Sequence, residues 1–439
     1  MFDNGEDSLI IKDQPLVEIK RSWFSRAFGK MEKDSQRKTI IVFLVTSTGT
    51  GTYSIFHILH GIGIVWGLLL ILTCCIFSTI AFNIYCHASI ANDNPEKLST
   101  IITKAVNSWF NVIVNIITGF YLYLILIAFC VGTSKLFYLV FEAKIWDMFV
   151  VDIEKRNFAS FNSVFSYLIC FCSFFLVVQK NIDKLSNFST LAFIVTFYLL
   201  VLILIQTPAY FAELKLKGLN EFNFLNCTLK DALYYFGLGA CTFNNVFCFL
   251  LVRNNVKNPT KKRLKKVSVR TNGLIYMLYL VCGLTSYLTL GITGAETTDL
   301  IIFREKIGET DNLMVIGQFL CALAIFVAFC LIAFSFKMII MEIFADKSAL
   351  KNLVVTVLMM LSIAYISSVN DNVTDYLTLT GAFAGTCSII IFPSIIALNT
   401  GYAKSFKGKV ALVVWLTFGV VMCIVSTYMS IIKFIHGHY

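Results

Sequence analysis

A short polar stretch, residues 46–54, interrupts the first long apolar run of the sequence with hydroxyl side chains and two glycines. A membrane helix that unwinds there leaves backbone N–H and C=O groups unpaired, which hydrocarbon tolerates only where protein or a water-filled cavity supplies partners. Free N–H groups at the start of a half-helix can bind an anionic group such as a carboxylate. We therefore predict a binding site formed by Thr48, Gly49, Thr50, Gly51 and Thr52.

A second stretch of small and polar residues, 234–245, lies inside a later apolar run and repeats the Gly-x-Gly pattern. Its candidate binding residues are Phe236, Gly237, Gly239 and Thr242. Small residues at short spacing also let membrane helices pack closely, so each stretch taken alone has a packing explanation. Interruptions at corresponding positions in two halves of one chain indicate the binding site of a transporter, which favours the site.

The elements that must position these residues are membrane helices. Hydrophobic residues make up 57% of the 439 residues and charged residues only 14%, whereas soluble proteins carry about 25% charged residues. The apolar runs reach the roughly 20 residues that cross a bilayer as a helix, and they lack the alternation of barrel strands. An all-α integral membrane protein follows. The net charge of +10 comes from basic loops, so we expect a lipid bilayer and no nucleic acid as partner.

Metal and catalytic motifs are missing from the sequence. The 14 cysteines are scattered through apolar segments without the paired CxxC elements of a zinc site, so we expect small buried residues and no bound metal. No HExxH or Gly-x-Ser-x-Gly motif occurs, and the polar residues within the apolar runs form no catalytic set. We therefore expect that the protein is not an enzyme.

The apolar runs predict eleven transmembrane helices, over residues 39–58, 62–86, 107–131, 161–179, 188–209, 231–252, 271–292, 313–337, 351–369, 376–398 and 409–433. With a cytoplasmic N-terminus, most of the 36 lysines and arginines fall on the inner side, as the positive-inside rule requires. The odd helix number then places the C-terminus outside or in a lumen. We expect a cytoplasmic tail over 1–38 without a cleavable signal peptide, a transmembrane domain over 39–433, and a short tail over 434–439.

Helices one and six begin two successive groups of five. Because five is an odd number, the second group enters the membrane from the opposite side, which makes an inverted repeat. The first repeat covers about 39–209, the second about 231–398, and the helix over 409–433 is an addition to both.

Several motifs resemble those of the amino acid/auxin permease family, which includes the sodium-coupled neutral and the vacuolar amino acid transporters. They are Gly49-Thr50-Gly51 followed by Gly63-Ile64, the basic segment 257–267 after helix six, Gly283 to Gly291 with Tyr287 in helix seven, and Thr380-Gly381 with Phe392-Pro393-Ser394 in helix ten. The sequence departs from the family's pattern at Phe56 and His57, where Pro-Tyr is usual, at Cys330 and Ser335, where helix eight usually has prolines, and at Lys337, where Arg is usual.

The resemblance implies a five-plus-five inverted-repeat fold of the LeuT/APC type, with interrupted helices one and six, and secondary-active symport of an amino acid. The substrate carboxylate would bind N–H groups around residues 49–51, and its ammonium would bind carbonyls freed near residues 236–239. A coupling Na+ would use helix one around Ser47 and the hydroxyl of Ser335 in helix eight, whereas a coupling H+ would use His57. No other cofactor is expected.

The sequence says less about the substrate and the membrane than about the fold. No Asp or Glu lies deep within a predicted span, which favours neutral amino acids over arginine or lysine. The family resemblance implies the plasma membrane or a vacuolar or lysosomal membrane. The alternative function is a non-transporting amino acid sensor or accessory subunit of the same fold, because the usual prolines of helix eight are absent. The sequence leaves the amino acid, the coupling ion, the direction of flux and the oligomeric state open.

Overall fold

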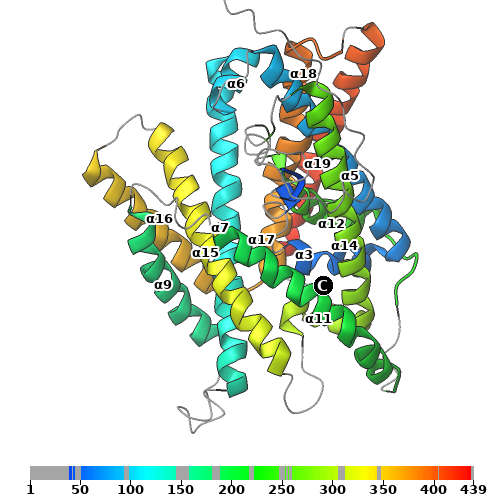
Figure 1. Cartoon of the computed structure of the whole chain (residues 1–439), viewed down its shortest axis with the longest axis vertical. Helices are drawn as coiled ribbons and strands as arrows, with labels where there is room; N and C mark the ends of the chain where they lie inside the picture. Colours follow the sequence, from blue (N-terminus) through cyan, green and yellow to red (C-terminus); the bar gives the residue numbers. More distant parts are fainter. Residues whose placement is uncertain are drawn as a thin grey trace, which may run out of the picture.

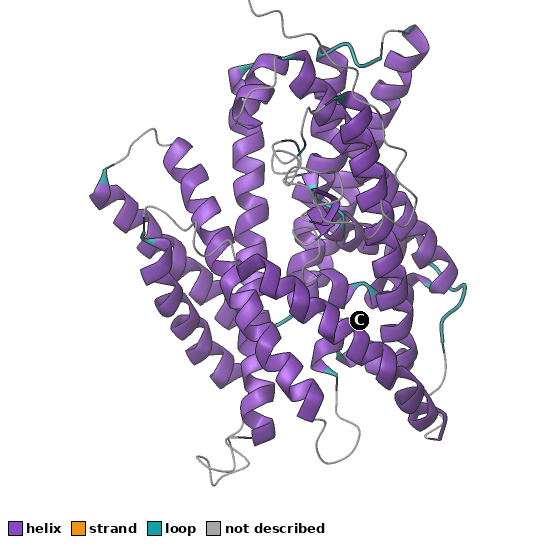
Figure 2. Ribbon diagram, viewed as in Figure 1, coloured by secondary structure: helices purple, strands orange, loops and turns teal. Residues whose placement is uncertain are grey.

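The computed structural model describes residues 39–41, 43–44, 51–92, 98–144, 158–179, 188–216, 222–246, 253, 256, 260–304, 312–343, 348–403 and 405–436. Every regular element among these residues is a helix, as Figure 2 shows. The all-helical class that the sequence predicts is therefore confirmed. Residues 45–50, which include Ser47, Thr48, Gly49 and Thr50 of the predicted site, lie outside the described residues.

The helices follow one another along the chain. They are α3 (Gly51–Ser54), α4 (Phe56–Ile62), α5 (Ile64–Ala91), α6 (Leu98–Ala105), α7 (Ser108–Lys144), α9 (Phe158–Val177), α11 (Phe188–Leu216), α12 (Leu229–Thr242), α14 (Lys261–Thr297), η3 (Ile301–Phe303), α15 (Asn312–Ile343), α16 (Ala349–Val369), α17 (Val373–Thr380), η4 (Gly381–Gly385), η5 (Cys387–Ile391), α18 (Phe392–Asn399) and α19 (Phe406–His436).

Eight helical stretches among the described residues are long and apolar enough to cross a membrane, and α9 is a shorter apolar helix. The segments α17, η4, η5 and α18 together form one of these eight, from Val373 to Asn399. The first and sixth predicted spans, 39–58 and 231–252, are described only in part. The predicted number of eleven helices therefore stays a prediction.

The helices pack in two groups, which Figure 1 shows side by side. In one group α7, α9, α15 and α16 contact one another, and in the other α4 and α5 contact each other and both contact α12 and α14. Helix α11 contacts both α15 and α14, and α17 contacts both α7 and α12, so these two elements join the groups. Helices distant in the sequence thus surround the first and sixth spans.

The corner between the first two spans is a glycine turn. Gly63 has φ 81°, in the left-handed region that glycine adopts without strain, and α5 begins at the next residue. The segment before α12 covers this corner, because the N–H of Ile64 donates to the carbonyl of Asn223 at 3.0 Å and that of Val65 to the carbonyl of Phe224 at 3.2 Å. The predicted glycine at the opening of helix two is confirmed.

Two links differ from the expected boundaries. The short helix α6 occupies part of the predicted link between helices two and three. Helix α14 begins at Lys261, within the basic segment predicted as a loop, and Thr260 caps it by accepting from the N–H of Arg263 at 3.4 Å. Charged residues are unfavourable in hydrocarbon and therefore predict a loop, yet a helix can extend beyond the bilayer into water.

Candidate functional site

The beginning of α3 lies directly against the end of α12. A Cβ atom built on Gly51 would stand 2.5 Å from Cγ2 of Thr242, closer than side-chain carbons approach. Helix α14 contacts both of these segments. The Sγ of Cys282 is 3.2 Å from the carbonyl of Thr52, and the hydroxyl of Tyr279 donates to the carbonyl of Thr242 at 3.2 Å. The structure thus brings together Gly51, Thr52 and Thr242 from the two predicted stretches.

The interruption of the sixth span falls one turn later than the sequence suggested. Helix α12 runs without a break through Phe236, Gly237 and Gly239 and ends at Thr242, with Phe243 as its C-cap. The carbonyl of Gly239 accepts from the N–H of Phe243 at 3.2 Å, so the carbonyls of residues 236–239 are not freed by unwinding. The expectation that this part of the helix is unwound is wrong, and the residues after Thr242 take its place.

Gly237 and Gly239 are required for packing. A Cβ on Gly237 would lie 2.5 Å from the carbonyl oxygen of Thr378, and one on Gly239 would lie 2.8 Å from the Sγ of Cys74. From the other side, a Cβ on Gly381 in η4 would stand 1.9 Å from the carbonyl oxygen of Gly237. The packing explanation of the second Gly-x-Gly therefore accounts for both of its glycines.

Asn244, just beyond the end of α12, is a polar residue of this region that the sequence reading did not single out. Its side chain is 7% exposed, and neither its amide nitrogen nor its amide oxygen has a hydrogen-bond partner in the described part of the chain. A buried polar group without a partner is costly, so such groups mark places where a ligand or water completes the bonding. The sequence signal that could have identified Asn244 is the pair of asparagines within the sixth predicted span.

The neighbouring Asn245 holds the interruption in place. It accepts from the hydroxyl of Ser78 on α5 at 2.7 Å and donates to the amide oxygen of Asn272 on α14 at 2.7 Å, and Asn272 donates to Thr79 at 2.8 Å. Asn245, Asn272 and Ser78 are all buried. A fully bonded polar network of this kind fixes the backbone at the point where α12 ends.

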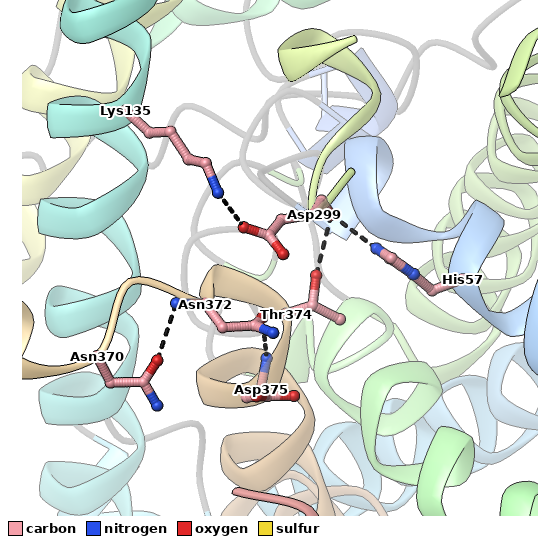
Figure 3. Close-up of polar contacts among 7 residues, drawn as sticks. All are labelled: His57, Lys135, Asp299, Asn370, Asn372, Thr374 and Asp375. Atoms are coloured by element: carbon pink, nitrogen blue, oxygen red, sulfur yellow. Dashed lines mark hydrogen bonds and ion pairs between the residues drawn. The ribbon is translucent and has the colours of Figure 1, made fainter. Parts of the chain in front are cut away.

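His57 lies at the start of α4, and its ring belongs to a cluster centred on Asp299. Figure 3 shows three side chains converging on this residue: Nε2 of His57 is 2.9 Å from its carbonyl oxygen, the hydroxyl of Thr374 donates to that oxygen at 2.9 Å, and Nζ of Lys135 is 2.5 Å from its carboxylate. These contacts tie α4, α7 and α17 to the turn after α14. His57 therefore belongs to a polar region that is centred on Asp299.

The two candidate residues of helix eight lie apart from the interruption. Ser335 is on an exposed face of α15, and its hydroxyl donates to the carbonyl of Leu331 at 3.0 Å. Lys337 is buried, and its ammonium donates to the carbonyls of Val177 and Gln179, at 2.5 and 3.4 Å, where α9 ends. Lys337 therefore caps a helix C-terminus and does not reach toward solvent as a rim residue would.

The described cysteines are mostly buried between the helices, and the described residues that could bind metal are scattered. Most of the described cysteines are buried and all of them are free. No group of three or more His, Cys, Asp or Glu that could hold a metal ion occurs among the described residues.

Solved structures place this arrangement in a known class. The chain shares the fold of MhsT in complex with L-phenylalanine, with a TM-score of 0.57, 13% identity, and coverage of 92% of this chain and 100% of that one. It also matches a manganese transporter of Eremococcus coleocola, solved with an aromatic bis-isothiourea substituted compound, with a TM-score of 0.53, 13% identity, and coverage of 92% and 88%. The fold is therefore that of a class of membrane transporters.

The sequence identifies the family within that class. Residues 32–432 match the family of transmembrane amino acid transporter proteins, and the chain belongs to this family. No curated protein matches the sequence. The predicted resemblance to amino acid permeases is confirmed, and the family is one of multi-pass membrane transporters and not of enzymes.

Proposed function

We propose that this protein is a secondary-active amino acid transporter with a five-plus-five inverted repeat, and that it binds the substrate carboxylate at the interruption of its first helix. Backbone N–H groups around residues 49–52 are the donors for the carboxylate. Acceptors for the α-ammonium come from the end of α12, where the helix stops at Thr242.

One observation supports this position of the site: Gly51 closely approaches Thr242, where the sequence predicts that the first span is interrupted and where α12 ends. The buried amide of Asn244, without a partner among the described residues, supplies a donor and an acceptor beside it. A zwitterion needs donors and acceptors side by side, and this place offers both.

For the coupling ion we propose H+ or Na+, with the Na+ ligands on helix one. Ser335 does not support a helix-eight ligand, because it faces away from the buried side of α15. Neutral amino acids are the proposed substrates, and the membrane is the plasma membrane or a vacuolar or lysosomal membrane with the N-terminus in the cytoplasm.

The test is uptake of labelled amino acids into proteoliposomes, with Na+ and pH gradients imposed separately. Gly51→Leu is expected to abolish uptake, because the side chain would collide with Thr242 and fill the interruption. Gly273→Leu is the matched control, since a Cβ on Gly273 meets nothing within 4 Å, and it should transport as the unchanged protein does.

Two results would change the proposal. Normal uptake by the Gly51→Leu variant would remove the site from helix one. Saturable amino acid binding without uptake under any gradient would make the protein a sensor or accessory subunit of the same fold.

A further inference from the structure

A second polar cavity lies at the end of the bundle where α4 finishes and α12 begins, which we call the outer pocket. It has a volume of about 440 Å³ and is enclosed by α4, the first turns of α12, the end of α14 with the turn after it, the start of α17 and the end of α19. Ligand pockets for small molecules span about 300–1,000 Å³, so the outer pocket is large enough for one. Neither Gly51 nor Thr242 lines the outer pocket, and His57 in its wall lies six positions after Gly51, roughly 9 Å along a helical path, so we treat it as distinct from the site at the interruption.

Carboxylates outnumber ammonium groups in its lining. Asp231, Glu296 and Asp299 line the pocket, and Lys433 is its lysine. The carboxylate of Asp299 is paired with Lys135 at 2.5 Å, whereas Asp231 and Glu296 form no ion pair with a described residue. Since charges in a partly enclosed site are screened less than in water, this lining attracts positive charge.

An aromatic surface faces the same space. The ammonium of Lys433 lies 4.0 Å from the centroid of the Tyr234 ring and 5.2 Å from that of Tyr235. The hydroxyl of Tyr234 donates to the carboxylate of Asp375 at 2.9 Å, which orients the ring. Cations placed over aromatic rings within about 6 Å are attracted by the ring quadrupole. The pocket therefore already holds an ammonium group, contributed by the end of α19.

We propose that the outer pocket is a second ligand site, which binds small organic cations carrying an ammonium or guanidinium group. The bound cation lies over Tyr234 and Tyr235 and faces Asp231 and Glu296. Lys433 is the resident competitor, because its ammonium occupies the same ring faces, and a ligand displaces it. The site needs no carboxylate on its ligand, in contrast to the site at the interruption.

Binding of labelled agmatine to the purified full-length protein tests the proposal, because agmatine has the cationic groups but no carboxylate. Asp231→Asn and Glu296→Gln should each weaken binding about tenfold, since each removes a charge that faces the ligand. Lys433→Met should strengthen binding by about tenfold because it removes the competitor, and a gain of affinity cannot result from misfolding. Lys230→Met, at an exposed lysine on the first turn of α12, is the control for loss of a positive charge and should bind as the unchanged protein does.

Gly51→Leu separates this proposal from the transport site, since it should abolish uptake and leave agmatine binding unchanged. The proposal is overturned if neither the unchanged protein nor Lys433→Met binds agmatine. It is overturned equally if Gly51→Leu removes binding while Asp231→Asn and Glu296→Gln retain it.

Discussion

Gly51 at the start of α3 and Thr242 at the end of α12 are packed closely, and a methyl group added at Gly51 would collide with the threonine. The Cγ2 of Thr242 is the atom nearest to a Cβ at position 51, at 2.5 Å, followed by the Cβ of Thr242 at 3.1 Å. The contact therefore depends on the threonine methyl more than on the backbone. This makes the pair suitable for a compensating substitution.

Gly51→Ala should lower uptake strongly, because overpacking of a tight contact costs about 1–3 kcal/mol. The double variant Gly51→Ala/Thr242→Ser removes the colliding methyl and keeps the hydroxyl that donates to the carbonyl of Gly239, so it should regain a large part of the activity. Initial uptake rates in proteoliposomes measure both. Equal loss in the single and double variants would mean that the methyl contact is not the reason for glycine.

Lys337 is a buried cation at the end of a helix, and its role is stability. Lys337→Met should lower the free energy of unfolding by up to about 2 kcal/mol, because it removes a positive charge from the carbonyls that end α9. Lys337→Arg keeps the charge and should lose less. Thermal unfolding of the detergent-solubilised protein measures the difference, and an unchanged melting temperature in Lys337→Met would contradict the capping role.

At the level of helices, the crossing of α12 and η4 brings two backbones into close contact. Gly237 and Gly381 face each other there, and η4 is π-helical, a form that often occurs at functional sites. The sequence could predict that small residues lie at this crossing. It could not place the end of α12, because glycines that break a helix and glycines that let helices approach have the same pattern.

Gly381→Ala should destabilise the protein or prevent its folding, since the new Cβ would stand 1.9 Å from the carbonyl oxygen of Gly237. Gly132→Ala on α7 is a matched buried control, because its Cβ would find its nearest atom at 3.9 Å. The yield of monodisperse protein and its melting temperature compare the two. Similar behaviour of both variants would show that the crossing can relax.

Across the whole molecule, the turn after α14 connects the two helix groups through Asp299. Its carboxylate pairs with Lys135 of one group, while its carbonyl binds His57 of the other. The pair is partly buried, with side-chain exposures of 24% and 16%. If the two helix groups move relative to each other during transport, these contacts of Asp299 must break or rearrange when the groups separate at this end of the bundle.

Asp299→Asn and Lys135→Met should each change the uptake rate about two- to fivefold, the size expected when an ion pair of about 1 kcal/mol is lost. The carbonyl contacts of residue 299 remain, so the turn stays in place. The exchanged pair Lys135→Asp/Asp299→Lys should return toward the original rate. If the exchanged pair departs further from the original uptake rate than either single variant does, the charge pair does not connect the two helix groups.

Much of the architecture could be predicted, since long apolar runs such as 409–433 have few alternatives to a membrane helix. The grouping of helices and the outer pocket could not. Asp231, Lys433 and the pair Glu296 and Asp299 come from three distant parts of the sequence, each near a helix end, where charged residues are ordinary. Only the folded arrangement reveals that these three helix ends meet.

The π-helical stretch of the tenth span also has a consequence for comparing this chain with its relatives. Its backbone hydrogen bonds reach five residues back, as between the N–H of Thr386 and the carbonyl of Gly381, so each turn holds more residues than an α-helical turn. The angular phase of α18 is therefore shifted relative to α17. An alignment that counts straight through residues 381–391 to a relative with a regular helix would assign the residues beyond to the wrong face, and it needs a gap there.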